Sequence, residues 1–307
     1  MRNLITRFWF SAPPVHPNRS LHIVRIVVAL IILAHPLYAL AHPADLAGYG
    51  QLIAHPLYAL THPGDLSGYG QTLQSQGLRW GLSLGLAWAA ILLQVACSLA
   101  LLARRFIIPA CIGHIIVLAG GILVLHLPHW YALGGAEVDG HPGIEFSVLL
   151  IACLASLLWA QKQGTAESDA RALHIIRIAS ALVIIAHPIH GVFDPEGLRG
   201  WGQSFNSPRF HHFPYGVPMV WTLMFFQISC CLALLSRRLV VPACLGHIFV
   251  LCMGIWISHA PRWFIVGPGE DGMEYSMVFL ACFLGVLLAH WPQENRDTQE
   301  KAVARVS

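Results

Sequence analysis

The chain has 307 residues, of which 56% are hydrophobic and only 11% are charged, and its net charge is +3. Soluble globular domains usually carry about 25% charged residues. This composition therefore excludes a soluble enzyme domain, a disordered chain and a nucleic-acid binder with a basic face. It predicts an all-α, polytopic membrane protein that is surrounded by a lipid bilayer.

Eight apolar segments are long enough, or nearly long enough, to cross a bilayer as helices, which takes about 20 residues. They are residues 21–41, 82–103, 106–127, 145–161, 173–193, 217–236, 239–258 and 275–291. The N-terminal segment, 1–20, holds no apolar stretch long enough for a cleaved signal peptide. The first span is expected to serve as the insertion signal, and the polar tail, 292–307, is expected to lie in solvent.

The chain contains an internal repeat. The segment LHIVRIVVALIILAHPLYAL, which begins at Leu21, recurs 152 positions later as LHIIRIASALVIIAHPIHGV. LLARRFIIPACIGHIIVL recurs 133 positions later as LLSRRLVVPACLGHIFVL, and IEFSVLLIACLASLLWA recurs 129 positions later as MEYSMVFLACFLGVLLA. The order is the same in both halves. The repeat predicts two four-helix units, 21–161 and 173–291, joined by a polar linker, 162–172.

A second, local duplication explains why the offset falls after the first span. Residues 35–51 recur as 55–71 with 14 of 17 positions identical, whereas the second half has one copy. Loops tolerate insertions at low cost. We expect the extra copy to be dispensable or to add a flap.

Basic residues predict the orientation of the chain. Fourteen of the 18 lysines and arginines fall on one side of the predicted bilayer, including the pairs Arg104–Arg105 and Arg237–Arg238. Because basic loops stay in the cytoplasm, both termini are expected to be cytoplasmic in a bacterial inner membrane. Four spans per unit give both units the same orientation, which makes the repeat parallel.

All eight cysteines lie inside apolar runs, and none forms a CxxC pair. Disulfide frameworks belong to the loops of small secreted domains. The cysteines are therefore expected to be small packing residues in membrane helices.

Polar residues that recur in both halves are the candidate ligand-binding residues, because polar groups inside a bilayer are costly. They are His35, Gln94, His126 and Glu145 in the first half, and His187, Gln227, His259 and Glu274 in the second. At a rise of 1.5 Å per residue, the histidine of the first span, the histidine of the third and the glutamate of the fourth reach a similar, outward level. Each half is thus predicted to carry its own set, with the glutamines near mid-membrane.

Four interpretations of these residues remain open. Stacked haems are disfavoured, because His22 and His35 are 13 residues apart and His114 and His126 are 12 apart, which places them on different helix faces. A metal site would need ligands from separate helices, and no metal is assigned. A quinone carbonyl or lipid headgroup matches a histidine beside a carboxylate. The fourth interpretation is that the histidines only cap helix ends at the water boundary.

The four-span unit resembles the DoxX family of bacterial membrane proteins. The motifs that carry the resemblance are RIVVALIILAHP and RIASALVIIAHP, the turn ALLARRFIIPA, the histidine that ends the third span, and the acidic loops GAEVDGHPGIEF and GPGEDGMEY. The resemblance covers nearly the whole chain as two copies. Pro36 and Pro188 replace the family's usual glycine, the nearby lysine is missing, and Gln94 and Gln227 replace its usual glutamate.

The resemblance implies a subunit or accessory of a quinone-linked membrane redox complex, with other subunits as partners. The sequence identifies no catalytic residue and leaves open whether the protein is an enzyme. A small-solute or proton transporter, in which the two bundles rock about a central axis, is the competing function. A lipid-embedded scaffold without a ligand is the third.

Overall fold

The computed structural model describes residues 17–41, 80–123, 144–207, 210, 212–259 and 273–291. Within these ranges the chain is helical and contains no β-strand. The helices are α2 (Pro17–Ala41), α5 (Trp80–Leu102), α6 (Ile107–Gly121), α7 (Glu145–Gln163), α8 (Ala166–Ile184), α9 (Ala186–Phe193), α10 (Pro195–Ser204), α11 (Gly216–Leu235), α12 (Val240–Gly254) and α13 (Glu274–His290). A short π-helical turn, η4 (Ile255–His259), extends α12.

The predicted all-helical fold is confirmed for the described residues. Four helical stretches there are long and apolar enough to cross a bilayer: Glu145–Gln163, Ala166–Phe193, Gly216–Leu235 and Val240–Ile257. Shorter apolar helices cover Leu92–Leu102, Ile107–Gly121 and Glu274–His290. The composition of these helices is compatible with a membrane protein.

Large apolar side chains cover the outside of the helices. Ile116 is 62% exposed and Phe249, its counterpart in the second half, is 64% exposed. The next such pair, Leu123 and Trp256, is 65% exposed at both positions. Soluble monomers rarely expose extended apolar patches, so these surfaces indicate an apolar surrounding.

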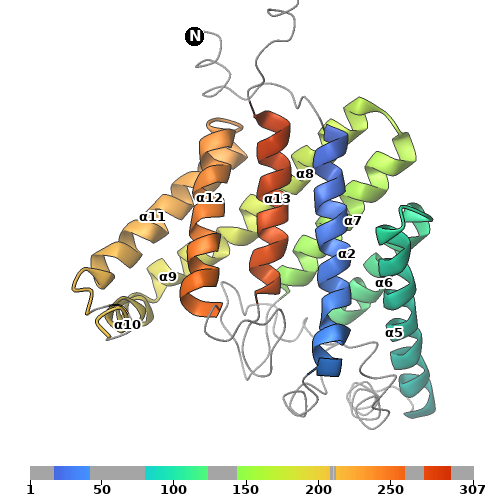
Figure 1. Cartoon of the computed structure of the whole chain (residues 1–307), viewed down its shortest axis with the longest axis horizontal. Coiled ribbons are helices and arrows are strands. Elements are labelled where there is room, and N and C mark those ends of the chain that lie inside the picture. Colours follow the sequence, from blue (N-terminus) through green and yellow to red (C-terminus); the bar gives the residue numbers. More distant parts are fainter. Residues whose placement is uncertain are drawn as a thin grey trace, which may run out of the picture.

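The first helix of each half packs most extensively against the last helix of the other half. α2 lies along α13, and α8 lies along α7, while α2 and α8 also contact each other (Figure 1). Gly285 allows the α2–α13 approach, because a Cβ there would lie 3.2 Å from the backbone oxygen of Ser20. The core is therefore shared between the two halves of the sequence.

The turns with the arginine pairs have the same backbone in both halves. Arg104 and Phe106 have φ values of 56° and 54°, and Arg237 and Leu239 have values of 56° and 53°. Left-handed backbone costs a non-glycine residue roughly 1–2 kcal/mol. Each turn also repeats the same hydrogen bonds, such as Arg105 N to Ala100 O and Arg238 N to Ala233 O, both 3.0 Å.

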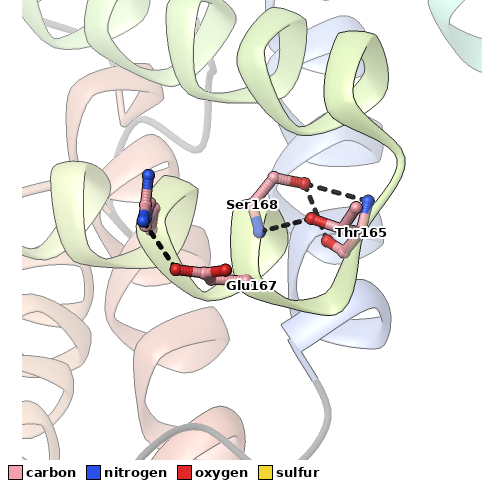
Figure 2. Close-up of polar contacts among 4 residues, drawn as sticks. Thr165, Glu167 and Ser168 are labelled. Atoms are coloured by element: carbon pink, nitrogen blue, oxygen red, sulfur yellow. Dashed lines mark hydrogen bonds and ion pairs between the residues drawn. The ribbon is translucent and has the colours of Figure 1, made fainter.

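The connection between α7 and α8 is shorter than the predicted linker, 162–172. α7 continues to Gln163 and ends at Gly164, whose φ is +63°. α8 begins at once, because Thr165 and Ser168 form a reciprocal capping box with both hydrogen bonds at 3.1 Å (Figure 2). An ion pair of 2.6 Å between Glu167 and Arg171 adds to the first turns of α8. The polar residues expected in a linker therefore form the exposed start of a helix.

The predicted span 173–193 is interrupted at Ile185, where α8 ends and α9 begins. Pro188 lies in the first turn of α9, where its missing N–H has no intrahelical partner to lose. α10 was not predicted. Its N-cap is Asp194, whose carboxylate accepts a hydrogen bond of 3.1 Å from Gly197 N. α10 packs against α11 and α9 at one end of the bundle (Figure 1).

Candidate functional site

The structure places the predicted site residues on several helices. Glu145 and Glu274 are the first residues of α7 and α13, and His187 lies in the first turn of α9. Gln94 on α5 and Gln227 on α11 are buried. His35 and His259 belong to helical backbone whose side chains lie outside the described part of the chain, and all of His126 lies outside it. The predicted level of these three histidines stays a prediction.

Tyr275 is the residue that brings predicted site residues together. Its Oη is oriented to donate a hydrogen bond to Glu145 Oε2, with 3.4 Å between the two oxygens. The ring of His187 meets the Tyr275 ring edge to face, with centroids 5.3 Å apart. A carboxylate and an imidazole thus contact the same phenol. Glu145 is only 9% exposed, so its carboxylate depends on such polar neighbours.

Apolar aromatic rings surround this group. The Tyr275 ring contacts Phe279 on its own helix, at a centroid distance of 4.8 Å, and Phe146 on α7, at 5.7 Å. Phe146 is the counterpart of Tyr275 in the repeat. Phenylalanine offers the same ring without a donor, so the two halves provide different hydrogen-bonding chemistry at this position.

Side chains of α7 and α13 touch at two levels, which explains why residues from both halves meet, although each of these helices packs more extensively on others. Phe146 contacts its counterpart Tyr275 at one level. Two helical turns further along, the Sγ of Cys153 lies 3.5 Å from the Sγ of its counterpart Cys282. The two helices therefore face each other with matching positions in contact.

The predicted sets, in which each half gathers its own histidines and glutamate, stay a prediction, because His35, His126 and His259 lie outside the described side chains. The described contacts join Glu145 of the first half to His187 of the second through Tyr275. A contact between the two halves was not predicted, because the repeat and the depth of each residue in its span do not tell which helices of the two units meet. Tyr275 was also missed as a site residue, although the glutamate–aromatic pair that begins the fourth span of each unit was visible.

The two buried glutamines do not belong to this group. Gln94 is on α5, which packs against α2 and α6, whereas Gln227 is on α11, which packs against α8, α9, α10 and α12. Figure 1 shows α5 and α11 on opposite flanks of the bundle. The structure therefore separates the two glutamines.

A second recurring polar feature is a buried histidine on the third helix of each half. His114 Nε2 lies 3.3 Å from Ser98 Oγ, and His247 Nε2 lies 3.5 Å from Cys231 Sγ. His247 also stacks on Phe283 at 4.7 Å with an interplanar angle of 9°. Both imidazoles are completely or almost completely buried. They tie the second helix of each half to the third.

Metal ligation is not supported by the part of the chain that the structure describes. No group of three or more histidine, cysteine, aspartate or glutamate side chains there is placed to hold a metal ion. All eight cysteines are free, and every one except Cys252 is buried. Their surroundings are those of packing residues.

Comparisons with known proteins give no match: no family model fits the chain, and neither a curated protein nor a solved structure resembles it significantly. The function is therefore inferred from the residues of the chain and from their geometry.

Proposed function

We propose that the chain is an integral inner-membrane protein with eight spans in two parallel four-helix units, 21–161 and 173–291, and with both termini in the cytoplasm. The apolar exposed surface and the one-sided arginine pairs support this proposal. Its function is to bind a quinone as a subunit or accessory of a membrane redox system. The resemblance of each unit to the DoxX family supports that role.

The Glu145–Tyr275–His187 group carries the proposal. A quinone headgroup is a flat ring with two carbonyl oxygens, which accept hydrogen bonds, and its quinol form has two hydroxyls, which donate them. The carboxylate of Glu145 is an acceptor for a quinol hydroxyl, and the Oη of Tyr275, whose proton is directed at Glu145, can accept as well. An imidazole at His187 can be a donor or an acceptor. The rings of Phe146 and Phe279 supply the apolar contacts that a flat ring needs.

Quinone binding tests the proposal directly. The purified protein is titrated under reducing conditions with a short-chain ubiquinol analogue, whose hydroxyl can donate to the Glu145 carboxylate, and binding is followed by the quenching of tryptophan fluorescence. We expect Glu145→Gln to weaken binding about tenfold, because a hydrogen bond to a charged group contributes about 1.5 kcal/mol or more. Tyr275→Phe is expected to weaken it as well, because it removes the hydroxyl that contacts Glu145. Glu274→Gln is the matched control, because Glu274 is the counterpart of Glu145 in the repeat and begins α13 as Glu145 begins α7.

A smaller effect is expected from Glu274→Gln than from Glu145→Gln. Unchanged affinity in Tyr275→Phe, Glu145→Gln and His187→Ala would exclude this group as the quinone site. No binding by the unmodified protein would favour the scaffold, and uptake of a solute or protons by proteoliposomes would favour the transporter.

A further inference from the structure

Four basic side chains of the second half gather at the end of the bundle that carries the arginine pairs, far from Tyr275. They are His174 and Arg177 on α8, Arg237 in the turn after α11, and His290 at the end of α13. Figure 1 shows the end of α13 beside the turn that joins α11 to α12. We call these four residues the basic cluster.

Contacts within the basic cluster are close. Arg177 Nη2 lies 2.9 Å from His174 Nδ1, and since a guanidinium only donates, His174 Nδ1 is the acceptor. His174 therefore carries its own N–H on Nε2. His290 Nδ1 lies 2.9 Å from the carbonyl oxygen of Val286 and donates to it, which leaves His290 Nε2 for another partner. Arg177, Arg237 and His174 all act electrostatically on His290.

Arg177 is the key residue of the cluster. It is 1% exposed, and its Nη1 has no hydrogen-bond partner although it is buried. Leaving a buried charged donor unpaired is costly. The positive charge of Arg237 acts on the same guanidinium and adds repulsion. A buried cation with an unused donor, beside other cations, is the arrangement that an anion would stabilise.

The equivalent arginine of the first half, Arg25, has different hydrogen-bond partners. Arg25 is also buried, but its Nη1 donates to the carbonyl oxygens of Leu101 and, at 3.4 Å, Leu102. These carbonyls belong to the last turn of α5, where the helix dipole is negative. The residue that corresponds to His290 in this half is Gln161, which carries no charge. The first half thus repeats three of the four positions, as His22, Arg25 and Arg104, but not the histidine at the fourth. The Nη1 of its arginine is paired with backbone, and only its Nε has no partner.

We propose that the basic cluster binds a phosphate-type oxyanion, presented either by an anionic lipid headgroup or as free phosphate. Arg177 Nη1 and His174 Nε2–H supply donors to its oxygens, and Arg237 supplies further positive charge. A bound anion would favour protonation of His290 at Nε2, which then donates as well. Arginine is suited to phosphate, because its planar guanidinium matches two oxygens at once. This site is separate from the proposed quinone site and does not depend on it.

Two probes distinguish the two sources of the anion. Inorganic phosphate is titrated into the full-length protein in an uncharged detergent, and phosphatidylglycerol is compared with phosphate-free diacylglycerol in the same detergent. Binding is followed by native mass spectrometry and by the rise in the thermal unfolding temperature. Stabilisation by phosphatidylglycerol alone assigns the site to a lipid, and stabilisation by phosphate as well assigns it to the free anion; either result supports the site.

Three variants test whether the basic cluster is responsible for binding the phosphate group. Arg177→Gln is expected to weaken binding of the supporting probe at least tenfold, because it removes both the charge and the paired donors. His290→Gln introduces the residue that the first half has at this position, and it changes a partly exposed side chain. It keeps the test valid if Arg177→Gln does not fold. We expect it to weaken binding severalfold. Arg25→Gln is the matched control and should bind like the unmodified protein. Binding that neither variant of the cluster changes, or the absence of stabilisation by both probes, would overturn the proposal.

Discussion

Replacing Phe249 with aspartate is expected to prevent α12 from inserting stably in a membrane. Phe249 is 64% exposed in the middle of α12. A charged side chain at the centre of a membrane helix costs about 2.5–3.5 kcal/mol on insertion scales, whereas on the surface of a soluble bundle it costs little. The yield of protein in the membrane fraction, compared with that of the unmodified chain, measures the effect.

Two further variants show whether the loss of yield depends on the apolar surface that Phe249 belongs to. Ile116→Asp changes the counterpart on α6, which is 62% exposed, and should fail in the same way. Ser236→Asp adds the same charge at the exposed turn after α11 and should leave the yield unchanged. Phe249→Asp protein that accumulates normally, or that becomes soluble without detergent, would contradict a membrane location for this surface.

Phe283→Ala is expected to destabilise the folded protein by about 3–5 kcal/mol, the usual cost of removing a buried phenylalanine ring. Phe283 is completely buried and lies between two other rings. It stacks on His247 at 4.7 Å and on Phe279 at 5.8 Å. The substitution therefore opens a cavity between α12 and α13. Unfolding in detergent, titrated with a denaturing detergent and followed by circular dichroism, measures the loss.

Leu284→Ala is the control for the cavity. Leu284 is the next residue on α13 and is 39% exposed, so its truncation should change the unfolding midpoint far less. Equal midpoints for Phe283→Ala and Leu284→Ala would show that the two positions do not differ in burial, contrary to the packing of α13 on α12.

The helices themselves could be predicted from the sequence, because their formation depends on local features. Long apolar runs predict helices, and each of the eight predicted ranges is helical where the structure describes it, apart from end residues and the break at Ile185. The short helix α10 was missed because its sequence, PEGLRGWGQS, holds three glycines and little apolar periodicity. The signal that could have found it is Asp194 before Pro195, an N-cap followed by proline at the first helical position.

The partners of each helix could not be predicted in the same way. High hydropathy marks a segment as an apolar helix, but it does not tell which helices fit against each other. The crossing of α2 on α13 depends on the space left by Gly285, and the meeting of α7 with α13 depends on small side chains at Cys153 and Cys282. The candidate site follows from those pairings. Glu145 was therefore predictable as a polar residue of interest, but its contact with Tyr275 of the other half was not.

Cross-linking of Cys153 to Cys282 tests most directly whether the halves meet along α7 and α13. The other six cysteines are replaced by alanine, a protease site is inserted at Gly164, and the membrane-bound protein is oxidised and then cleaved. The 3.5 Å between the two Sγ atoms predicts that the fragments stay joined on a non-reducing gel and separate after reduction. Fragments that separate without reduction, while Cys153→Ala behaves identically, would contradict the arrangement that brings Glu145, Tyr275 and His187 together.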